Sequence, residues 1–339
     1  MNALVLEEVR KFDSLQLQKV VLPDLGPFDV RVKINAAALN HRDVWIIQGL
    51  YAKIKLPVIL GSDGSGVVVE VGESVDKTWE GKSVVINPAL DWGDEPAAQQ
   101  PQFRILGMPD QGTQAEYVVV PVENIHDKPS HLSFDEAAAL PLAGLTAFRA
   151  LFTQGEIGPS DVILITGIGG GVAAIAMQMA LALGVKVYMT SGDDLKIKKA
   201  KTLGAIDGVN YHDKDWSTAL FTLGGKSGFN VVIDSAGGPE FGQLLDLVKA
   251  GGKVITFGAT AGNTGDINLR KIFWKQIRIQ GTTMGTPEDF QNMLQFITEH
   301  QIKPIIHAVY DISDYRKAYQ DMRDGQQFGK IVLKIAASG

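Results

Sequence analysis

A cluster of glycines in the middle of the chain could bind the phosphates of a dinucleotide. Four of them follow the apolar run 162–165: Gly167, Gly169, Gly170 and Gly171. Glycine lets the backbone approach a ligand closely, and the first N–H groups of a helix attract anions. The pattern of strand, glycine turn and helix therefore predicts contacts with a pyrophosphate from Gly169, Gly170, Gly171 and Val172. A tight turn that only requires positive φ angles is the alternative interpretation.

The end of the second predicted strand would decide which dinucleotide binds. NAD-binding sheets usually carry Asp or Glu here, about 20 residues after the glycines, to bind the ribose hydroxyls. In this chain the strand ends at Ser191, which is small and uncharged, and Lys196 follows. A hydroxyl and a cation suit the 2′-phosphate of NADPH. Alternatively, Asp193 or Asp194 binds the ribose hydroxyls instead of capping the next helix.

Alternating strands and helices surround this turn. We expect about six parallel strands between residues 128 and 284, which is the number in a doubly wound sheet. Ligands bind such sheets at the carboxyl ends of the strands. Ser235 and Gly258 follow two of the predicted strands, so both are candidates for lining the cofactor.

The flanking sequence suggests a second, β-rich domain. Residues 1 to about 125 show strand patterns, with a short helix expected at 40–48 and an irregular segment at 88–109. The tail has two predicted helices and a strand at 330–335, and it could return to complete this domain. The expected domains are therefore 1–127 with 285–339, and 128–284. The predicted fold class is α/β, with a second domain rich in β-strands.

Composition excludes several classes of function. The 339 residues include no cysteine, which rules out disulfides, thiolate nucleophiles and cysteine-ligated zinc. A net charge of −6 gives no basic face for nucleic acid, and no apolar run is long enough to anchor the chain in a membrane. No Gly-x-Ser-x-Gly motif of a serine hydrolase occurs. We expect a cytoplasmic protein without a nucleic-acid or membrane partner.

Several ordered motifs together resemble one known family. They are Leu39-Asn-His-Arg-Asp-Val-Trp-Ile-Ile-Gln-Gly-Leu-Tyr51, Leu60-Gly-Ser-Asp-Gly-Ser-Gly66, Gly112-Thr-Gln-Ala-Glu-Tyr117, Ala137-Ala-Ala-Leu-Pro141, Gly144-Leu-Thr146, the glycine turn, and Gly329-Lys-Ile-Val-Leu333. In this order they resemble the medium-chain dehydrogenases/reductases, and specifically the zinc-free, quinone-oxidoreductase-like branch. The resemblance implies a Rossmann domain and a GroES-like catalytic domain built from both ends of the chain, with the cofactor in the cleft.

The resemblance also locates the positions at which zinc-dependent relatives bind metal. Those positions fall at Asn40, Ser62 and near Leu142, and the segment that carries four structural cysteines in relatives has none here. Zinc needs about three protein ligands, preferably His or Cys. We therefore expect no zinc, with an unconventional site of His41, Asp43 and Asp63 as the alternative.

Without a metal, a hydrogen-bond donor must stabilise the negative charge that hydride transfer creates on the substrate. Asn40 is the first candidate, and Tyr51 is the second because it could donate a hydrogen bond or a proton. Trp45 could form an aromatic wall beside a flat substrate, and Thr146 matches a position near the nicotinamide in similar enzymes. A turn-capping Asn, a surface Tyr, a core Trp and a helix-capping Thr are the alternatives.

The resemblance further favours NADPH over NADH. Lys196 matches a lysine that binds the 2′-phosphate, and Tyr211 matches a tyrosine that packs beside it. The predicted function is hydride transfer from NADPH to a quinone or an α,β-unsaturated carbonyl. The alternatives are a zinc-free carbonyl or acryloyl-thioester reductase, an alcohol dehydrogenase-like enzyme, and a non-catalytic NADPH-binding regulatory protein. Pairing of the predicted edge strand 277–281 with its symmetry mate suggests a homodimer.

Overall fold

The computed structural model describes residues 1–335, and the chain forms two compact units. Unit 1 combines residues 1–143 with the chain from residue 286 onward, and unit 2 comprises residues 144–285. The first boundary falls inside α3 (Pro141–Phe148), later than the predicted position at residues 127 and 128. The reason is that α2 (Phe134–Ala138) packs on β3 and β5 of unit 1. Within the described residues, no helix is both long and apolar enough to cross a membrane.

Unit 2 contains a six-stranded parallel sheet with the order β13-β12-β11-β14-β15-β16. The strands are β11 (Val162–Ile165), β12 (Lys186–Ser191), β13 (Asp207–Asn210), β14 (Phe229–Asp234), β15 (Val248–Thr256) and β16 (Arg278–Gly281). Counted along the chain, the order is 3-2-1-4-5-6, which is that of a Rossmann sheet. The predicted set of six parallel strands is confirmed.

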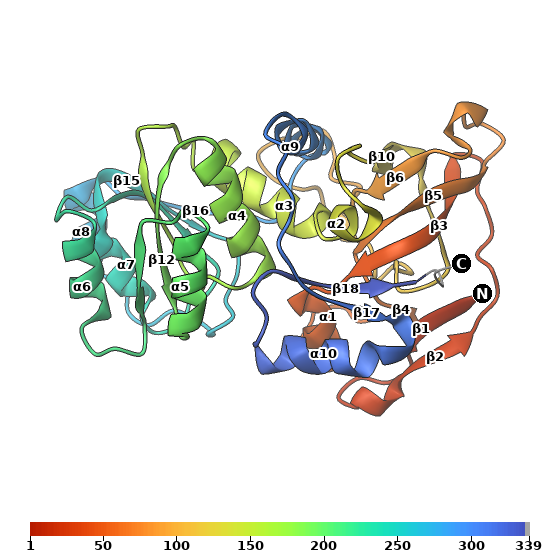
Figure 1. Ribbon diagram of the computed structural model, residues 1–339, viewed down its shortest axis with the longest axis horizontal. Coiled ribbons are helices and arrows are strands. Elements are labelled where there is room, and N and C mark those ends of the chain that lie inside the picture. Colours follow the sequence, from red (N-terminus) through yellow and green to blue (C-terminus); the bar gives the residue numbers. More distant parts are fainter. Residues whose placement is uncertain (336–339) are drawn as a thin grey trace. The chain divides into compact units, whose positions relative to one another are not determined.

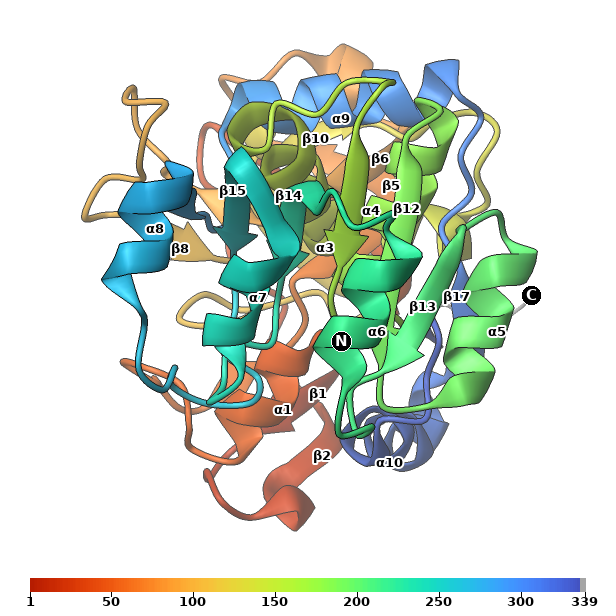
Figure 2. The same ribbon diagram turned by 90° about the vertical axis from the view of Figure 1, so that its left-hand side faces the viewer.

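Helices cover both faces of this sheet (Figure 1). On one side lie α4 (Gly171–Ala182) and α5 (Asp194–Thr202), and on the other lie α6 (Trp216–Leu223), α7 (Phe241–Leu247) and α8 (Leu269–Lys275). Figure 2 looks onto the face that α6 and α7 cover. Because helices cover both faces, the central strands are apolar throughout, as Ile163, Leu164 and Val232 illustrate with no exposed area.

Unit 1 is built on a seven-stranded sheet with the order β10-β6-β5-β3-β18-β17, in which β9 also pairs with β3. Its strands are β3 (Asp29–Ala38), β5 (Asp63–Val71), β6 (Ser83–Ile86), β9 (Tyr117–Pro121), β10 (Ile125–Asp127), β17 (Ile306–Asp311) and β18 (Lys330–Lys334). A smaller sheet pairs β1 (Asn2–Leu6) with β2 (Leu15–Lys19) and β4 (Val58–Ile59). The predicted irregular segment contains only a short ribbon of β7 (Ala89–Leu90) and β8 (Arg104–Ile105).

The tail of the chain completes unit 1, as the sequence suggested. It adds α9 (Pro287–Glu299), α10 (Tyr315–Asp324), β17 and β18. Strand β18 runs antiparallel to β3, and Ala38 pairs with Val332 on one side and with Asp63 on the other. The end of β3 therefore lies between the first residues of β5 and β18. Helix α1 (His41–Ile47) begins just beyond this point, so its first turn faces both neighbouring strands.

Candidate functional site

The glycine turn joins β11 to α4 in unit 2. Gly167 and Gly169 have φ angles of +66° and +125°, in the region that side chains other than glycine rarely adopt. The turn is tied to the neighbouring strand, because Ile168 N donates to Thr190 O at 2.8 Å. Gly170 is the N-cap of α4. The predicted sequence of strand, glycine turn and helix is thus present.

The first turn of α4 fits a pyrophosphate. Its first N–H groups have no partner inside the helix, and the helix dipole adds partial positive charge there. No acidic side chain lies in this turn, which includes Gly171 and Val172. The backbone alone would therefore form the anion site, as expected for a dinucleotide.

Loops at the carboxyl ends of β14 and β15 come close to the same turn. A Cβ atom at Gly258 would lie 2.8 Å from Ser235 O, so only glycine allows this approach. A Cβ atom at Gly167 would lie 3.6 Å from Ser235 Oγ. The structure thus brings Ser235 to the glycine turn and Gly258 to Ser235, at the carboxyl edge of the sheet where ligands bind.

Asp234 holds the loop after β14. Its carboxylate accepts hydrogen bonds from Thr166 Oγ1 at 2.8 Å and from Gly237 N at 3.0 Å. Burial raises the pKa of Asp234, although these hydrogen bonds act in the opposite direction. Since both of its oxygens are bonded within the protein, Asp234 shapes the loop that carries Ser235.

Ser191 lies at the end of β12, where the ribose would bind, but its side chain is buried. Its hydroxyl donates to Ile168 O at 3.3 Å and accepts from Asp193 N at 3.2 Å. Ser191 thus connects the glycine turn to the loop before α5. Asp193 caps α5, because its carboxylate accepts from Leu195 N at 2.8 Å.

The other predicted phosphate-binding residues surround this loop. Tyr211 lies over the backbone just after Ser191, since a Cβ atom at Gly192 would be 2.7 Å from Tyr211 Oη. Lys196 is half-buried, and burial lowers its pKa while the charge of Asp193 raises it. Asp194 accepts a hydrogen bond from Asn210 Nδ2 at 3.0 Å. Both aspartates therefore have partners within the protein.

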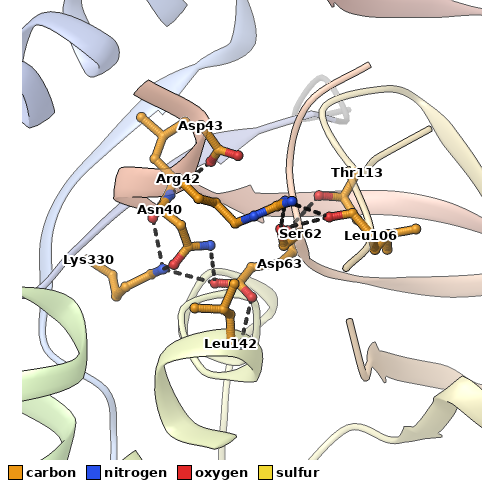
Figure 3. Close-up of polar contacts among 10 residues, drawn as sticks. Asn40, Arg42, Asp43, Ser62, Asp63, Leu106, Thr113, Leu142 and Lys330 are labelled. Carbon is orange, nitrogen blue, oxygen red and sulfur yellow. Dashed lines mark hydrogen bonds and ion pairs between the residues drawn. The ribbon is translucent and has the colours of Figure 1, made fainter. Parts of the chain in front are cut away.

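Unit 1 carries a candidate site of its own, a buried cluster around Asn40 (Figure 3). Asn40 is the N-cap of α1, and the residue is buried, with 8% of its surface exposed. Its Nδ2 donates to Asp63 Oδ2 at 2.9 Å, and its Oδ1 accepts from Lys330 Nζ at 2.6 Å. Strand register explains the meeting, because Asp63 and Lys330 begin the two strands that flank β3.

Asp63 is held on both carboxylate oxygens. Leu142 N donates to Oδ1 at 2.7 Å, and Lys330 Nζ forms an ion pair with Oδ2 at 2.9 Å. Asp63 has no exposed area. A fully buried carboxylate requires such a set of partners, because burial without compensation is very unfavourable.

Arg42 organises the loops next to this cluster. Its guanidinium group donates to Ser62 Oγ at 2.7 Å and to the carbonyl oxygens of Leu106 and Met108. The ring of Tyr51 packs on the guanidinium at 5.1 Å. Ser62 lies at one of the zinc-ligand positions of the family. Its hydroxyl accepts a hydrogen bond from Arg42 and donates one to the Leu106 carbonyl oxygen.

The surroundings of Asp43, next to this cluster, disfavour its charge. It is fully buried, and burial raises its pKa to about 6, whereas Arg42 and the Asn40 N–H lower it. Its Oδ2 accepts from Asn40 N at 2.9 Å, which completes a capping box at α1. Its Oδ1 has no hydrogen-bond partner among residues 1–335.

Two other predicted site residues, Trp45 and Tyr51, contact side chains of the first turn of α1. Trp45 is half-buried, and its ring lies 6.1 Å from that of His41. Tyr51 contacts Arg42 rather than Asn40. Thr146 is buried in α3, within the part of that helix that belongs to unit 2. Within unit 1, the structure thus joins Asn40 to Asp63 and Lys330.

The residues of this cluster do not fit a zinc ion. An ammonium group lies 2.9 Å from the Asp63 carboxylate, which accepts from the Asn40 side chain, and it would repel a dication. Amide and hydroxyl groups replace the expected His and Cys ligands. Across residues 1–335, no three His, Cys, Asp or Glu side chains gather as a metal site, so the alternative set of His41, Asp43 and Asp63 is not formed.

Sequence reasoning missed Lys330. It lies in Gly329-Lys-Ile-Val-Leu333, whose pattern predicts a strand and matches a family motif but indicates no role for the lysine. A lysine that opens an otherwise apolar strand is a usable signal, since such a residue needs a buried anion nearby. The strand register that brings it to Asn40, however, joins positions at opposite ends of the chain.

Comparison with known proteins identifies both units. Residues 26–130 match the alcohol dehydrogenase GroES-like domain, and residues 171–299 match the zinc-binding dehydrogenase family. Unit 1 is therefore a β-rich GroES-like domain, and unit 2 is a Rossmann domain.

Relatives match over nearly the whole chain. A zinc-type alcohol dehydrogenase-like protein of Leptosphaeria maculans is 36% identical, over 95% of this chain and 94% of the relative. An acryloyl-coenzyme A reductase of Sulfurisphaera tokodaii is 28% identical, over 94% of this chain and 96% of the relative. The crystal structure of an NAD-dependent alcohol dehydrogenase superposes with a TM-score of 0.93 at 36% identity, over 99% of this chain and 100% of that one. The chain belongs to the medium-chain dehydrogenase/reductase superfamily and is an oxidoreductase that uses a nicotinamide cofactor.

Proposed function

We propose that this protein transfers hydride from NADPH to an α,β-unsaturated carbonyl or a quinone without using zinc. The observation that carries the proposal is the buried cluster of Asn40, Asp63 and Lys330. An amide donor lies where metal-dependent relatives place a zinc ligand, and an ammonium group already neutralises the neighbouring carboxylate. Asn40 would therefore supply the electrophilic contact that a metal supplies in those relatives.

When bound, the cofactor would supply a hydride with its two electrons. As the hydride adds to the β-carbon of an enone, one electron pair moves onto the carbonyl oxygen. An Nδ2–H of Asn40 would stabilise this developing enolate oxygen by donating a hydrogen bond. A proton taken up from water at the α-carbon then completes the saturated carbonyl. With a quinone, the hydride and one proton from water together convert the two carbonyl groups into the two hydroxyl groups of a hydroquinone.

Tyr51 and Trp45 are proposed as supporting residues. Tyr51 packs on the Arg42 guanidinium, so its position is fixed from one side. Trp45 is half-buried and has an aromatic face for a planar acceptor. Thr146 is proposed to lie near the nicotinamide, as the family motif implies.

The preference for NADPH rests on the loop that follows β12. The strand ends without an acidic side chain, and Asp193 and Asp194 bond to the α5 N-terminus and to Asn210. Lys196 and Tyr211 border the same loop. NADH is the competing outcome, because a structural relative is named NAD-dependent.

The test is a panel of reactions with the purified protein. NADPH and NADH oxidation would be followed with quinones, enones, an acryloyl thioester and aldehydes, and NADP⁺ reduction with alcohols, each with and without a chelator. We expect the highest kcat/KM with NADPH and an enone or quinone, unchanged by the chelator. Alcohol oxidation that the chelator abolishes would contradict the proposal.

Two other functions compete in the same panel. The names of the relatives favour an alcohol dehydrogenase-like or acryloyl-thioester-reducing enzyme, which would show its preference for those acceptors. A regulatory protein that only binds NADPH would show tight binding and no turnover with any acceptor.

We also propose that the protein is a homodimer joined at β16. This strand is the sheet edge and pairs only with β15 among the described strands. The adjacent α8 exposes apolar side chains, with Phe273 at 66% and Trp274 at 82% exposed area. Pairing of two such edges would cover both features.

A further inference from the structure

Lys330 places an ammonium group inside the Asn40 cluster (Figure 3). The residue is 4% exposed. Its Nζ donates to Leu39 O at 2.8 Å, to Asn40 Oδ1 at 2.6 Å and to Asp63 Oδ2 at 2.9 Å. An ammonium group has three N–H donors, so these acceptors engage all of them. Lys330 in this arrangement has no donor for a substrate and acts through its neighbours.

The same contacts fix the orientation of the Asn40 amide. Its Oδ1 faces an ammonium group, which can only donate, and its Nδ2 faces a carboxylate, which can only accept. A flipped amide would place NH₂ against the ammonium of Lys330 and an oxygen against the carboxylate of Asp63. Both hydrogen bonds would be lost and both new contacts would be repulsive. One Nδ2–H is therefore bonded to Asp63, and the second has a single defined direction.

Asp63 is itself immobilised, which makes the arrangement rigid. Leu142 N donates to its Oδ1 at 2.7 Å, and Thr113 Oγ1 donates to its backbone oxygen at 2.7 Å. The amide of Asn40 is thus held between a fixed anion and a fixed cation. A donor held in advance stabilises charge in the transition state without reorganising during the reaction.

We propose that Lys330 is a positioning residue, whose ammonium group holds the Asn40 amide so that its second Nδ2–H meets the substrate oxygen. This inference rests on the proposed role of Asn40 as the donor. Without the ammonium group, the amide oxygen loses its partner and the amide can rotate. The donor would then be misplaced when charge develops, which lowers kcat more than it raises KM.

A double-mutant cycle tests the inference. We would measure kcat and KM of the wild type, Asn40→Ala, Lys330→Met and the combined variant, with saturating NADPH and the best enone of the panel. Loss of one oxyanion donor lowers kcat by about 100-fold, so we expect that loss for Asn40→Ala and roughly 10- to 100-fold for Lys330→Met. In the Asn40→Ala background, Lys330→Met should cost less than about threefold more, because coupled residues are not additive.

A second variant separates positioning from folding. Lys330→Met leaves a buried carboxylate unpaired and is expected to lower Tm. The variant Asp63→Asn with Lys330→Met removes both charges, so we expect it to regain much of the Tm but not the kcat. Recovery of kcat together with Tm would show that Lys330 serves stability alone and would overturn the inference. Lys317→Met, at an exposed position of α10, is the matched control.

The outcomes also separate this inference from the proposed function. If Asn40→Ala lowers kcat while Lys330→Met does not, Asn40 remains the donor and the positioning role of Lys330 is overturned. Equal losses from Lys330→Met in both backgrounds would overturn it as well. If Asn40→Ala keeps the wild-type kcat, the donor role fails and the positioning role fails with it.

Discussion

Lys196 is the side chain on which the proposed preference for NADPH depends most directly. We expect Lys196→Ala to raise KM for NADPH by about 10- to 100-fold, because a charged hydrogen bond to phosphate contributes roughly 1.5–3 kcal/mol. KM for NADH, which lacks that phosphate, should change little. Steady-state kinetics with both cofactors would measure this.

The matched control is Lys198→Ala, an exposed position on the same helix. It should leave both KM values near those of the wild type. An equal rise for NADH and NADPH in Lys196→Ala would contradict a contact with the 2′-phosphate.

Asp43 gives a second prediction at this scale, which concerns stability and pH. Its folded-state pKa of about 6 lies above its ordinary value of 3.8. Between these values the folded protein binds more protons than the unfolded chain, so the wild type loses stability as pH rises from about 4 to 6. The full cost is present above pH 6 and absent below pH 4.

Asp43→Asn removes this titration and keeps an acceptor for the Asn40 N–H. The free energy of unfolding of the variant minus that of the wild type should therefore increase by up to about 3 kcal/mol across the interval. Denaturant titrations at pH 4, 5, 6 and 7 would show it. A difference that stays constant with pH would mean that burial does not raise this pKa.

The sequence anticipated some of these side chains and not others. Asn40 could be proposed as a donor because its position in a motif is visible in the sequence. The partners that orient it could not be inferred, since Lys330 reaches Asn40 only through the pairing of β18 with β3. Ser191 is predicted to bind the 2′-phosphate, and no local pattern reveals that its hydroxyl also donates to Ile168 O.

At the scale of elements, prediction succeeded where burial imposes a pattern. Strands β11 and β14 are covered on both faces, so their apolar runs are evident. Helices α6 and α8 were not predicted. Helix α8 has no buried residue, and three of its apolar side chains, Leu269, Phe273 and Trp274, are exposed, so it lacks the periodicity that marks a helix packed on a core.

A substitution at Gly258 tests whether the loop after β15 contributes to binding of the cofactor. In Gly258→Ala the new Cβ atom would lie 2.8 Å from Ser235 O, so one loop must move. We expect Kd for NADPH to rise by roughly tenfold, which corresponds to about 1.4 kcal/mol. Fluorescence titration with NADPH would measure it.

Gly158→Ala is the control, because its Cβ atom would have no neighbour within 4 Å. This variant should bind NADPH like the wild type. Unchanged binding in Gly258→Ala would show that the loop after β15 lies away from the cofactor.

At the scale of the whole molecule, the edge strand β16 should determine the oligomeric state. We expect Ile279→Lys to reduce the mass in solution from twice the 36.6 kDa of the chain to a single copy, because a charge on this strand opposes edge pairing. Size-exclusion chromatography with light scattering would measure it. Val69→Lys, on a half-exposed strand position of unit 1, is the control, and a monomeric wild type would contradict the proposal.

The route of the chain through unit 1 has a consequence for its synthesis. Asn40 and Asp63 leave the ribosome before any of unit 2, whereas Lys330 leaves after all of it. Until β18 pairs with β3, Lys330 cannot form its ion pair with Asp63. Burial of the Asp63 carboxylate before that point would be unfavourable, because its charge would be unpaired. We therefore expect the Rossmann unit to fold first during translation, and the Asn40 site to close as the last strand is inserted.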